Sequence, residues 1–296
     1  MAAQPRFRDR ALLLAGPALL TIVIFMVLPM AIALVYSFMT ASPYGGVEKP
    51  YTAGAYVRFV YDRDLDDSLV FDTTYLQIFA RSLILAALTS LGCLLIGLPM
   101  AWYVATRRPV QRQILVLLVT IPFWTNLLIR TYCWVLLLRD QGLVNNVLLW
   151  LGLTKAPITF LYSDGAVLLG LIYSSLPFMV LPIYGALEKM DPRLVEAAYD
   201  LYADRWAIMR KLVWPLAKPG VAAGNLLVFV PALGAFLQPD ILGGGKKLMI
   251  GSLIQQQFTT GRNWAFGAAL SMILMAFVLG AMMWSAWRRA AIAVPV

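Results

Sequence analysis

One charged stretch interrupts an otherwise apolar chain: Asp191-Pro-Arg-Leu-Val-Glu-Ala-Ala-Tyr-Asp-Leu-Tyr-Ala-Asp-Arg-Trp206. It opens with a good helix N-cap, Asp191, followed by a proline that suits a first helical turn. Apolar residues then recur at helical spacing on one face: Leu194, Val195, Ala198 and Leu201. After a break near residues 202–204, a second amphipathic run is expected to end at Pro215 and Pro219. The segment predicts two short helices along a membrane face or, more simply, a loop covering a bundle.

The composition around this stretch is that of a membrane protein. Of the 296 residues, 61% are hydrophobic and 13% are charged, whereas soluble domains are roughly 45–50% apolar and about 25% charged. The net charge of +9 comes without a long basic tract, which argues against nucleic-acid binding. The chain has no histidine, and its two cysteines lack a Cys-x-x-Cys spacing, so we expect buried free thiols and no metal site.

Six apolar segments are long enough to cross a bilayer, which takes about 20 residues. The predicted spans are Ala11–Phe38, Ser82–Thr106, Ile114–Leu138, Gly165–Leu187, Pro219–Pro239 and Trp264–Trp287. The first exceeds the apolar region of a secretory signal, about 7–15 residues, so we expect it to remain as a helix. The shorter stretch Leu143–Leu153 predicts a re-entrant or interfacial helix. The expected fold is an all-α integral membrane protein with six transmembrane helices.

The positions of lysine and arginine set the predicted orientation. With the N-terminus inside, the inside segments hold 14 basic residues and the outside loops hold 8, and basic residues favour the cytoplasmic side. Both termini, residues 1–10 and 288–296, are therefore predicted to be cytoplasmic. Residues 39–81 form an acidic outside loop, either a solvated face or a surface that attracts cations. Residues 82–287 form the core, with the charged segment at 188–218 inside.

The charged segment resembles the EAA motif of ABC importer permeases, E-A-A-x3-G-x9-I-x-L-P. The positions that match in register are Glu196, Ala197, Ala198 and Pro215. Tyr202 replaces the glycine of the motif, Leu212 the isoleucine and Trp214 the leucine. If the glycine position needs a positive φ, Tyr202 would be strained by about 1 kcal/mol or more. We expect the two short helices to meet there, with the tyrosine side chain packed.

The resemblance implies a type I, MetI-like permease in the bacterial inner membrane. Its coupling helices, including Asp200, would dock on a separate ATPase dimer that holds ATP and Mg²⁺, so this chain would bind no cofactor and would not be an enzyme. A second permease subunit and an extracytoplasmic binding protein would complete the importer. The chain's own Gly243-Gly-Gly-Lys-Lys247 lacks the Gly-x4-Gly-Lys-Ser/Thr spacing of a phosphate-binding loop and predicts a glycine turn.

A further resemblance concerns the cargo. The stretches Leu117–Trp134, Gly142–Gly152, Pro177–Tyr184 and Pro239–Gly244 are similar to spermidine/putrescine permeases of the PotB/PotH type. The similarity implies a polyamine cargo, although related permeases carry other amines, opines or ferric iron.

Polyamine ammonium groups need carboxylates and aromatic faces, each cation–π contact being worth about 0.5–2 kcal/mol. Asp240, at the outer end of the fifth span, is the candidate carboxylate, and Asn126 is a candidate polar contact. The aromatic candidates, for which packing or an interfacial belt is the alternative, are Trp124, Tyr132, Tyr173 and Phe236.

Arg130 is the one charged residue within the predicted spans. At 1.5 Å per residue it lies roughly 24 Å past Ile114, toward the outer leaflet. A path for cations would not leave this guanidinium unpaired. We therefore predict that Arg130 pairs with a carboxylate, with Asp240 as a candidate, in a structural bridge or an outer gate.

Two other functional classes are weaker interpretations. An ion-coupled secondary transporter would show inverted repeats and membrane carboxylates, and neither is evident. A membrane enzyme would need a metal or acid–base cluster within the spans, and the sequence has none.

Overall fold

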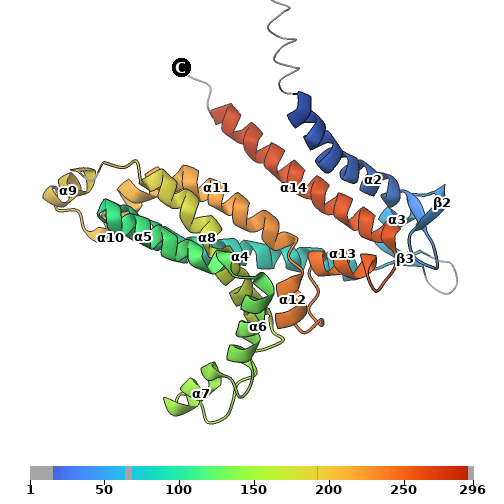
Figure 1. The fold of residues 1–296 in the computed structure, drawn as a ribbon, viewed down its shortest axis with the longest axis horizontal. Helices are drawn as coiled ribbons and strands as arrows, with labels where there is room; N and C mark the ends of the chain where they lie inside the picture. Colours follow the sequence, from blue (N-terminus) through green and yellow to red (C-terminus); the bar gives the residue numbers. More distant parts are fainter. Residues whose placement is uncertain (1–15, 64–68, 192, 293–296) are drawn as a thin grey trace, which may run out of the picture. The chain divides into compact units, whose positions relative to one another are not determined.

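The computed structural model describes residues 16–63, 69–191 and 193–292, which are mostly helical (Figure 1). They form two compact units: one combines the chain up to Leu76 with the chain from Ile254 onward, and the other is Gln77–Leu253. The predicted N-terminal segment, the start of the first span, Pro192 and the last four residues lie outside the described residues.

The predicted six spans appear as five continuous helices and one bent pair. The continuous helices long and apolar enough to cross a bilayer are Gly16–Ser37, Thr74–Ala105, Asp164–Leu187, Arg205–Leu233 and Trp264–Trp284. The bent pair joins Pro109–Trp124 to Leu127–Trp150 at an angle of 89°. Within the described residues, the number of spans is therefore as predicted if the bent pair counts as one.

The first unit is built on two long helices that lie side by side. One contains the π turn η1 (Val23–Val27) and α2 (Leu28–Ser37), and it contacts α14 (Trp264–Ile292) (Figure 1). The predicted acidic loop carries short elements: β1 (Met39–Ala41) paired with β2 (Val47–Tyr51), the helical turn α3 (Gly54–Val57), and β3 (Tyr61–Arg63) paired with β4 (Leu69–Phe71).

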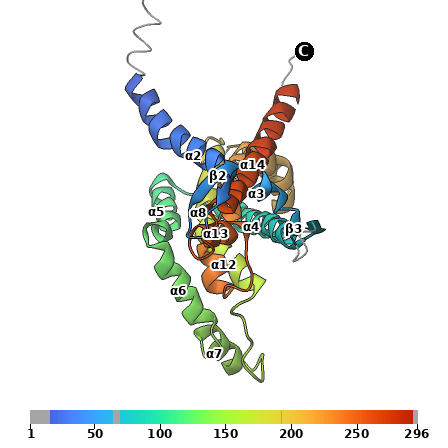
Figure 2. The same ribbon diagram turned by 90° about the vertical axis from the view of Figure 1, so that its right-hand side faces the viewer.

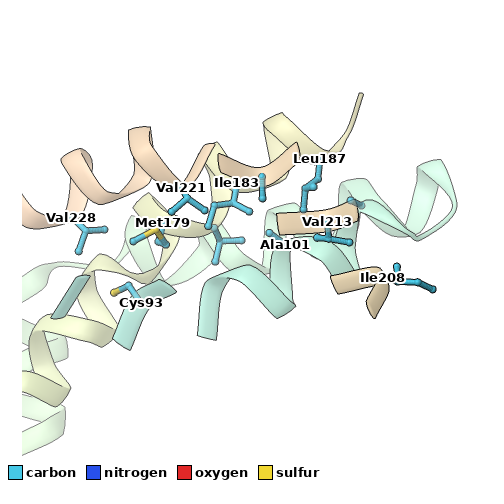
Figure 3. Close-up of a cluster of buried hydrophobic side chains, with 12 residues drawn as sticks. Cys93, Ala101, Met179, Ile183, Leu187, Ile208, Val213, Val221 and Val228 are labelled. Atoms are coloured by element: carbon cyan, nitrogen blue, oxygen red, sulfur yellow. The ribbon is translucent and has the colours of Figure 1, made fainter. Parts of the chain in front are cut away.

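The second unit is centred on α8 (Asp164–Leu187) and α11 (Trp214–Leu233), which pack along each other beside α4 (Thr74–Ala105) (Figure 1). Glycine permits the close approach: a Cβ on Gly220 would lie 2.5 Å from the carbonyl oxygen of Pro182. The core between these helices contains Cys93, Ala101, Met179, Ile183, Val221 and Val228 (Figure 3). This core continues to Ile208 and Val213, which belong to the charged segment (Figure 3).

The third predicted span, Ile114–Leu138, is wrong as a single helix. It consists of α5 (Pro109–Thr120), the 3₁₀ turn η2 (Ile121–Trp124) and α6 (Leu127–Leu138). Pro122 supplies no backbone donor, and Asn126 caps a new helix by accepting a 2.8 Å hydrogen bond from the Leu128 N–H. The chain therefore turns sharply, and α6 leads away from α5 toward α7 (Leu143–Trp150) (Figure 2). The predicted short helix at 143–153 is confirmed as α7, and its re-entrant or interfacial position stays a prediction.

Two helix boundaries also differ from the prediction. The second span begins at Thr74 rather than Ser82, because Asp72 caps it by accepting a 2.8 Å hydrogen bond from the Thr74 N–H. The charged segment does not end at Pro215 and Pro219, because one helix runs from Arg205 to Leu233. Within it, α10 (Arg205–Ile208) leads into the π turn η3 (Met209–Val213), and the Trp214 N–H donates to the Met209 carbonyl. This wider turn accommodates the missing donor and the bulky ring of Pro215.

The fifth span is shorter at its C-terminal end than predicted. Its helix stops at Leu233, and Pro239 belongs to a separate short helix, α12 (Leu237–Leu242), ahead of α13 (Ile250–Phe258). Of the two free cysteines, Cys93 is buried as expected, whereas the prediction was wrong for Cys133, which is exposed in this chain.

Candidate functional site

The charged segment folds as the short helix α9, a tight turn and the beginning of the long helix Arg205–Leu233. Helix α9 (Arg193–Asp200) directs Val195 and Ala198 inward and leaves Glu196, Ala197 and Asp200 exposed. Asp204 begins α10, because its carboxylate accepts a 2.9 Å hydrogen bond from the Ala207 N–H. The predicted break between the two helices is confirmed.

The segment is anchored to the core of the second unit. Ile208 and Val213 are 1% and 0% exposed and lie in the same cluster as Met179 and Ile183 of α8 (Figure 3). Ala198 of α9 packs against this cluster as well. A force applied to the short helices would therefore reach α8 and α11 through close-packed side chains.

Tyr202 takes the backbone conformation that the motif glycine would supply. Its φ is +56°. The Ala203 N–H donates to the Ala198 carbonyl at 3.0 Å and the Tyr202 N–H donates to the Tyr199 carbonyl at 2.9 Å, which is the Schellman pattern with Tyr202 at C′. The expectation that its side chain is packed was wrong, because Tyr202 is 98% exposed. The left-handed turn holds the ring away from the core.

The exposed turn is apolar as well as aromatic. Leu201 is 81% exposed and Trp206 is 72% exposed beside Tyr202. We call these three residues the coupling turn. Together with the exposed Glu196 and Ala197 of α9, they present a surface that can seat in a groove of another protein.

A second feature lies at the start of α6. Arg130 lines a cavity of about 280 Å³ together with aromatic and polar side chains, among them Phe123, Phe178, Phe236, Ser175 and Gln238. Its Nε and Nη1 atoms are buried and have no hydrogen-bond partner. We call this space the Arg130 cavity.

The predicted pairing of Arg130 with Asp240 is not present. Ion pairs among the described residues of the second unit join Arg81 and Lys247 to Asp164, and Arg112 to Glu188. Asp240 lies half-buried on α12 and does not line the Arg130 cavity.

The other pathway candidates are scattered. Tyr173 packs edge-on against Trp134, with ring centroids 5.5 Å apart, and lines a different, apolar cavity of about 640 Å³. Asn126 is engaged as the cap of α6. Trp124 and Tyr132 are 83% and 56% exposed. Of these candidates, the structure brings only Phe236 and Arg130 to a common cavity.

Sequence reasoning missed the polar lining of that cavity. Gln238 is 6% exposed, and its Nε2 donates to the Ser174 hydroxyl oxygen at 3.1 Å. The available signal was a serine pair, Ser174 and Ser175, in the middle of an apolar span, facing a glutamine just before Pro239.

The glycine-rich stretch is a turn, as predicted. Gly244 and Gly245 have φ values of +65° and +67°. Lys247 that follows them pairs with Asp164, its Nζ lying 3.7 Å from the carboxylate oxygen. These features belong to a structural turn and form no cradle for phosphate.

Comparisons with known proteins agree on one class of protein, the membrane component of a transport system. The family described as "Binding-protein-dependent transport system inner membrane component" matches residues 93–287. The chain is 39% identical over 267 residues to the spermidine/putrescine transport system permease protein PotB of Escherichia coli K12, covering 90% of this chain and 93% of that protein. The PotB of Haemophilus influenzae is 38% identical over 261 residues, 87% of each chain.

A solved structure shares the fold. A chain of the bacterial alginate ABC transporter, crystallised in complex with alginate pentasaccharide-bound periplasmic protein, superposes with a TM-score of 0.72 at 18% identity, over 95% of each chain.

Proposed function

Because the chain belongs to the family of binding-protein-dependent transport system inner membrane components, we propose that it forms the translocation path of an importer for a polyamine, putrescine or spermidine. The chain is a multi-pass membrane permease, a transport subunit and not an enzyme. The observation that carries the proposal of a polyamine is the 39% identity to a spermidine/putrescine permease along nearly the full length of both proteins.

The partners follow from this proposal. An ATPase dimer that binds ATP and Mg²⁺ receives the coupling turn and α9, and an extracytoplasmic protein delivers the amine. A second permease subunit completes the path, and both termini of this chain lie in the cytoplasm. The distribution of basic residues, 14 inside and 8 outside, supports this orientation.

The geometry supports a direct mode of coupling. Closure of the ATPase dimer moves α9 and α10, and Ile208 and Val213 transmit the movement into the α8–α11 core. Because one helix runs from Arg205 to Leu233, the end of the charged segment and the fifth span move together. No flexible linker separates the docking element from the membrane helix within this range.

The test is reconstitution of the complete importer in lipid nanodiscs. Binding protein loaded with putrescine or spermidine should stimulate ATP hydrolysis, and binding protein loaded with another amine or ferric iron should not. Stimulation by a different solute alone would overturn the polyamine cargo and leave the permease role intact. Uptake that survives the loss of ATP and stops with the proton gradient would instead indicate a secondary transporter.

A further inference from the structure

The Arg130 guanidinium differs from the other half-buried arginines of the second unit. Arg81 and Arg112 also have a buried Nε without a hydrogen-bond partner. Each of them is nevertheless neutralised by a carboxylate, Asp164 for Arg81 and Glu188 for Arg112. Arg130 has two such nitrogens, Nε and Nη1, and no carboxylate among the described residues lies within ion-pair distance.

The surroundings of Arg130 do not compensate for its charge. Phenylalanine rings from three segments line the cavity, and the described residues that line it include no acidic side chain. The Ser174 hydroxyl donates to the Gly170 carbonyl at 2.9 Å and accepts from Gln238, so it is already engaged. Buried guanidinium nitrogens without a hydrogen-bond partner are unfavourable, and ionisable residues within membrane segments are candidates for functional sites.

The backbone also favours an anion at this place. Arg130 lies in the first turn of α6, a helix of 12 residues, just after the 89° bend of the broken span. The amino end of a helix carries a partial positive charge, and discontinuous membrane helices present such ends to anionic groups. The helix end and the guanidinium therefore reinforce each other.

We propose that the Arg130 cavity is a carboxylate-binding site whose acceptor comes from outside this chain. A carboxylate would satisfy the free N–H groups and neutralise the guanidinium. The carboxylate belongs either to a side chain of the second permease subunit or to a carboxylated solute. Polyamines carry no carboxylate, so a polyamine importer requires the first source, in which the paired arginine no longer repels the cation. This inference rests on the proposed assembly but not on the identity of the cargo.

The direct test is a cryo-electron microscopy map of the wild-type importer in nanodiscs. We expect a carboxylate oxygen within hydrogen-bond distance of Nε or Nη1 of Arg130. The residue or small molecule that carries it identifies the source. Only carbonyl or water oxygens around the guanidinium would overturn the proposal.

A chemical test uses the variant Arg130→Lys in the assembled importer. A hydrophobic carbodiimide activates a neighbouring carboxyl group, the new amine attacks it, an amide bond forms and a urea is released. We expect a cross-link to the second permease subunit, mapped by mass spectrometry to an acidic residue. The wild-type chain and Arg130→Gln, which carry no amine there, are the controls.

A comparison of ornithine with putrescine, which differ by one carboxylate, tests whether a solute supplies the acceptor for Arg130. If the solute supplies the acceptor, ornithine should raise the melting temperature of the wild-type importer, putrescine should not, and Arg130→Gln should abolish the shift. If neither the cross-link nor the shift is found, the site is refuted. If polyamines do not stimulate ATP hydrolysis but the cross-link forms, the proposed polyamine cargo is refuted and the carboxylate-binding site is supported.

Discussion

The coupling turn and the Arg130 cavity differ in the kind of side chain that has no partner within the described chain. At the turn, the apolar side chains of Leu201, Tyr202 and Trp206 are exposed. In the cavity, a charged side chain has buried nitrogens without an acceptor. Exposed apolar area is unfavourable by roughly 25 cal/mol per Å², and a buried unpaired polar group costs about 1–3 kcal/mol or more. Each region lacks the kind of partner group that its chemistry requires: an apolar groove for the turn and an acceptor for the arginine.

The difference also predicts how each region responds to mutation. The side chains of the coupling turn stand outside the core, so their replacement should affect association far more than the stability of the chain. The residues beneath it, and the arginine in the cavity, should affect the stability of the chain or of the importer.

The largest effect is expected from Ile208→Asp, which places a carboxylate in the core beneath the turn, where the wild-type side chain is 1% exposed. An unpaired buried charge typically costs about 3–5 kcal/mol. The purified chain should melt at a clearly lower temperature and lose co-purification with the ATPase. Leu201→Asp, the matched change at an exposed position, should lose ATPase binding with an unchanged melting temperature. Equal destabilisation by both variants would contradict the division between turn and core.

Arg130→Gln should affect the stability of the isolated chain and the stability of the importer differently. In the isolated chain the substitution removes an unpaired buried charge, so stability should stay equal or rise. In the importer it should destabilise the assembly by about 2–5 kcal/mol, the usual effect of leaving one member of a buried charge pair alone. Melting curves of chain and importer, recorded side by side, measure both. Destabilisation of the isolated chain would mean that an acceptor is already present within it.

Trp206→Ala should weaken ATPase association by about 2 kcal/mol, because exposed aromatic anchors dominate interfaces of this kind. Binding of the ATPase to the permease in nanodiscs measures the loss, which corresponds to roughly a 30-fold weaker Kd. Trp150→Ala is the control: that tryptophan is 84% exposed on α7, away from the turn. A similar loss from both variants would remove the special role of the turn.

The smallest effect is expected at Tyr202. Its left-handed conformation costs about 1–2 kcal/mol in a residue with a Cβ, and glycine relieves that strain but loses about 0.5–1 kcal/mol through its greater freedom in the unfolded chain. Tyr202→Gly should therefore raise the stability of the purified chain by at most about 1.5 kcal/mol. Tyr202→Ala keeps the strain and should not stabilise. Stabilisation by alanine would show that the strain comes from the ring and not from the backbone.

The sequence predicted the parts of this protein that depend on local chemistry. Hydropathy located five continuous spans and the bent pair, because crossing a bilayer requires about 20 consecutive apolar residues wherever they pack. The EAA match and the charges placed the two short helices and the break at Tyr202. The sequence left open whether this position needs a positive φ, and the structure has a φ of +56° there without glycine.

The predictions that were wrong concerned positions where local signals compete or where distant segments of the chain meet. Pro215 and Pro219 looked like helix ends, but a π turn lets the helix pass through them. The third span looked continuous, but Pro122 and the cap at Asn126 bend it. Asp240 looked like the partner of Arg130 because both stand alone in apolar sequence, but no ion pair joins them and Asp240 does not line the Arg130 cavity.

The sequence by itself thus determined the class of this protein, the apolar segments of its spans and the position of helix α9 and of the break after it, because hydrophobic length, helix caps and motif spacing act over a few residues. Only the tertiary structure decided that the coupling turn is exposed while its base is buried, and that two buried nitrogens of Arg130 have no hydrogen-bond partner among the described residues. Exposure and pairing depend on which segments meet, and that is a property of packing over the whole unit and not of any local pattern.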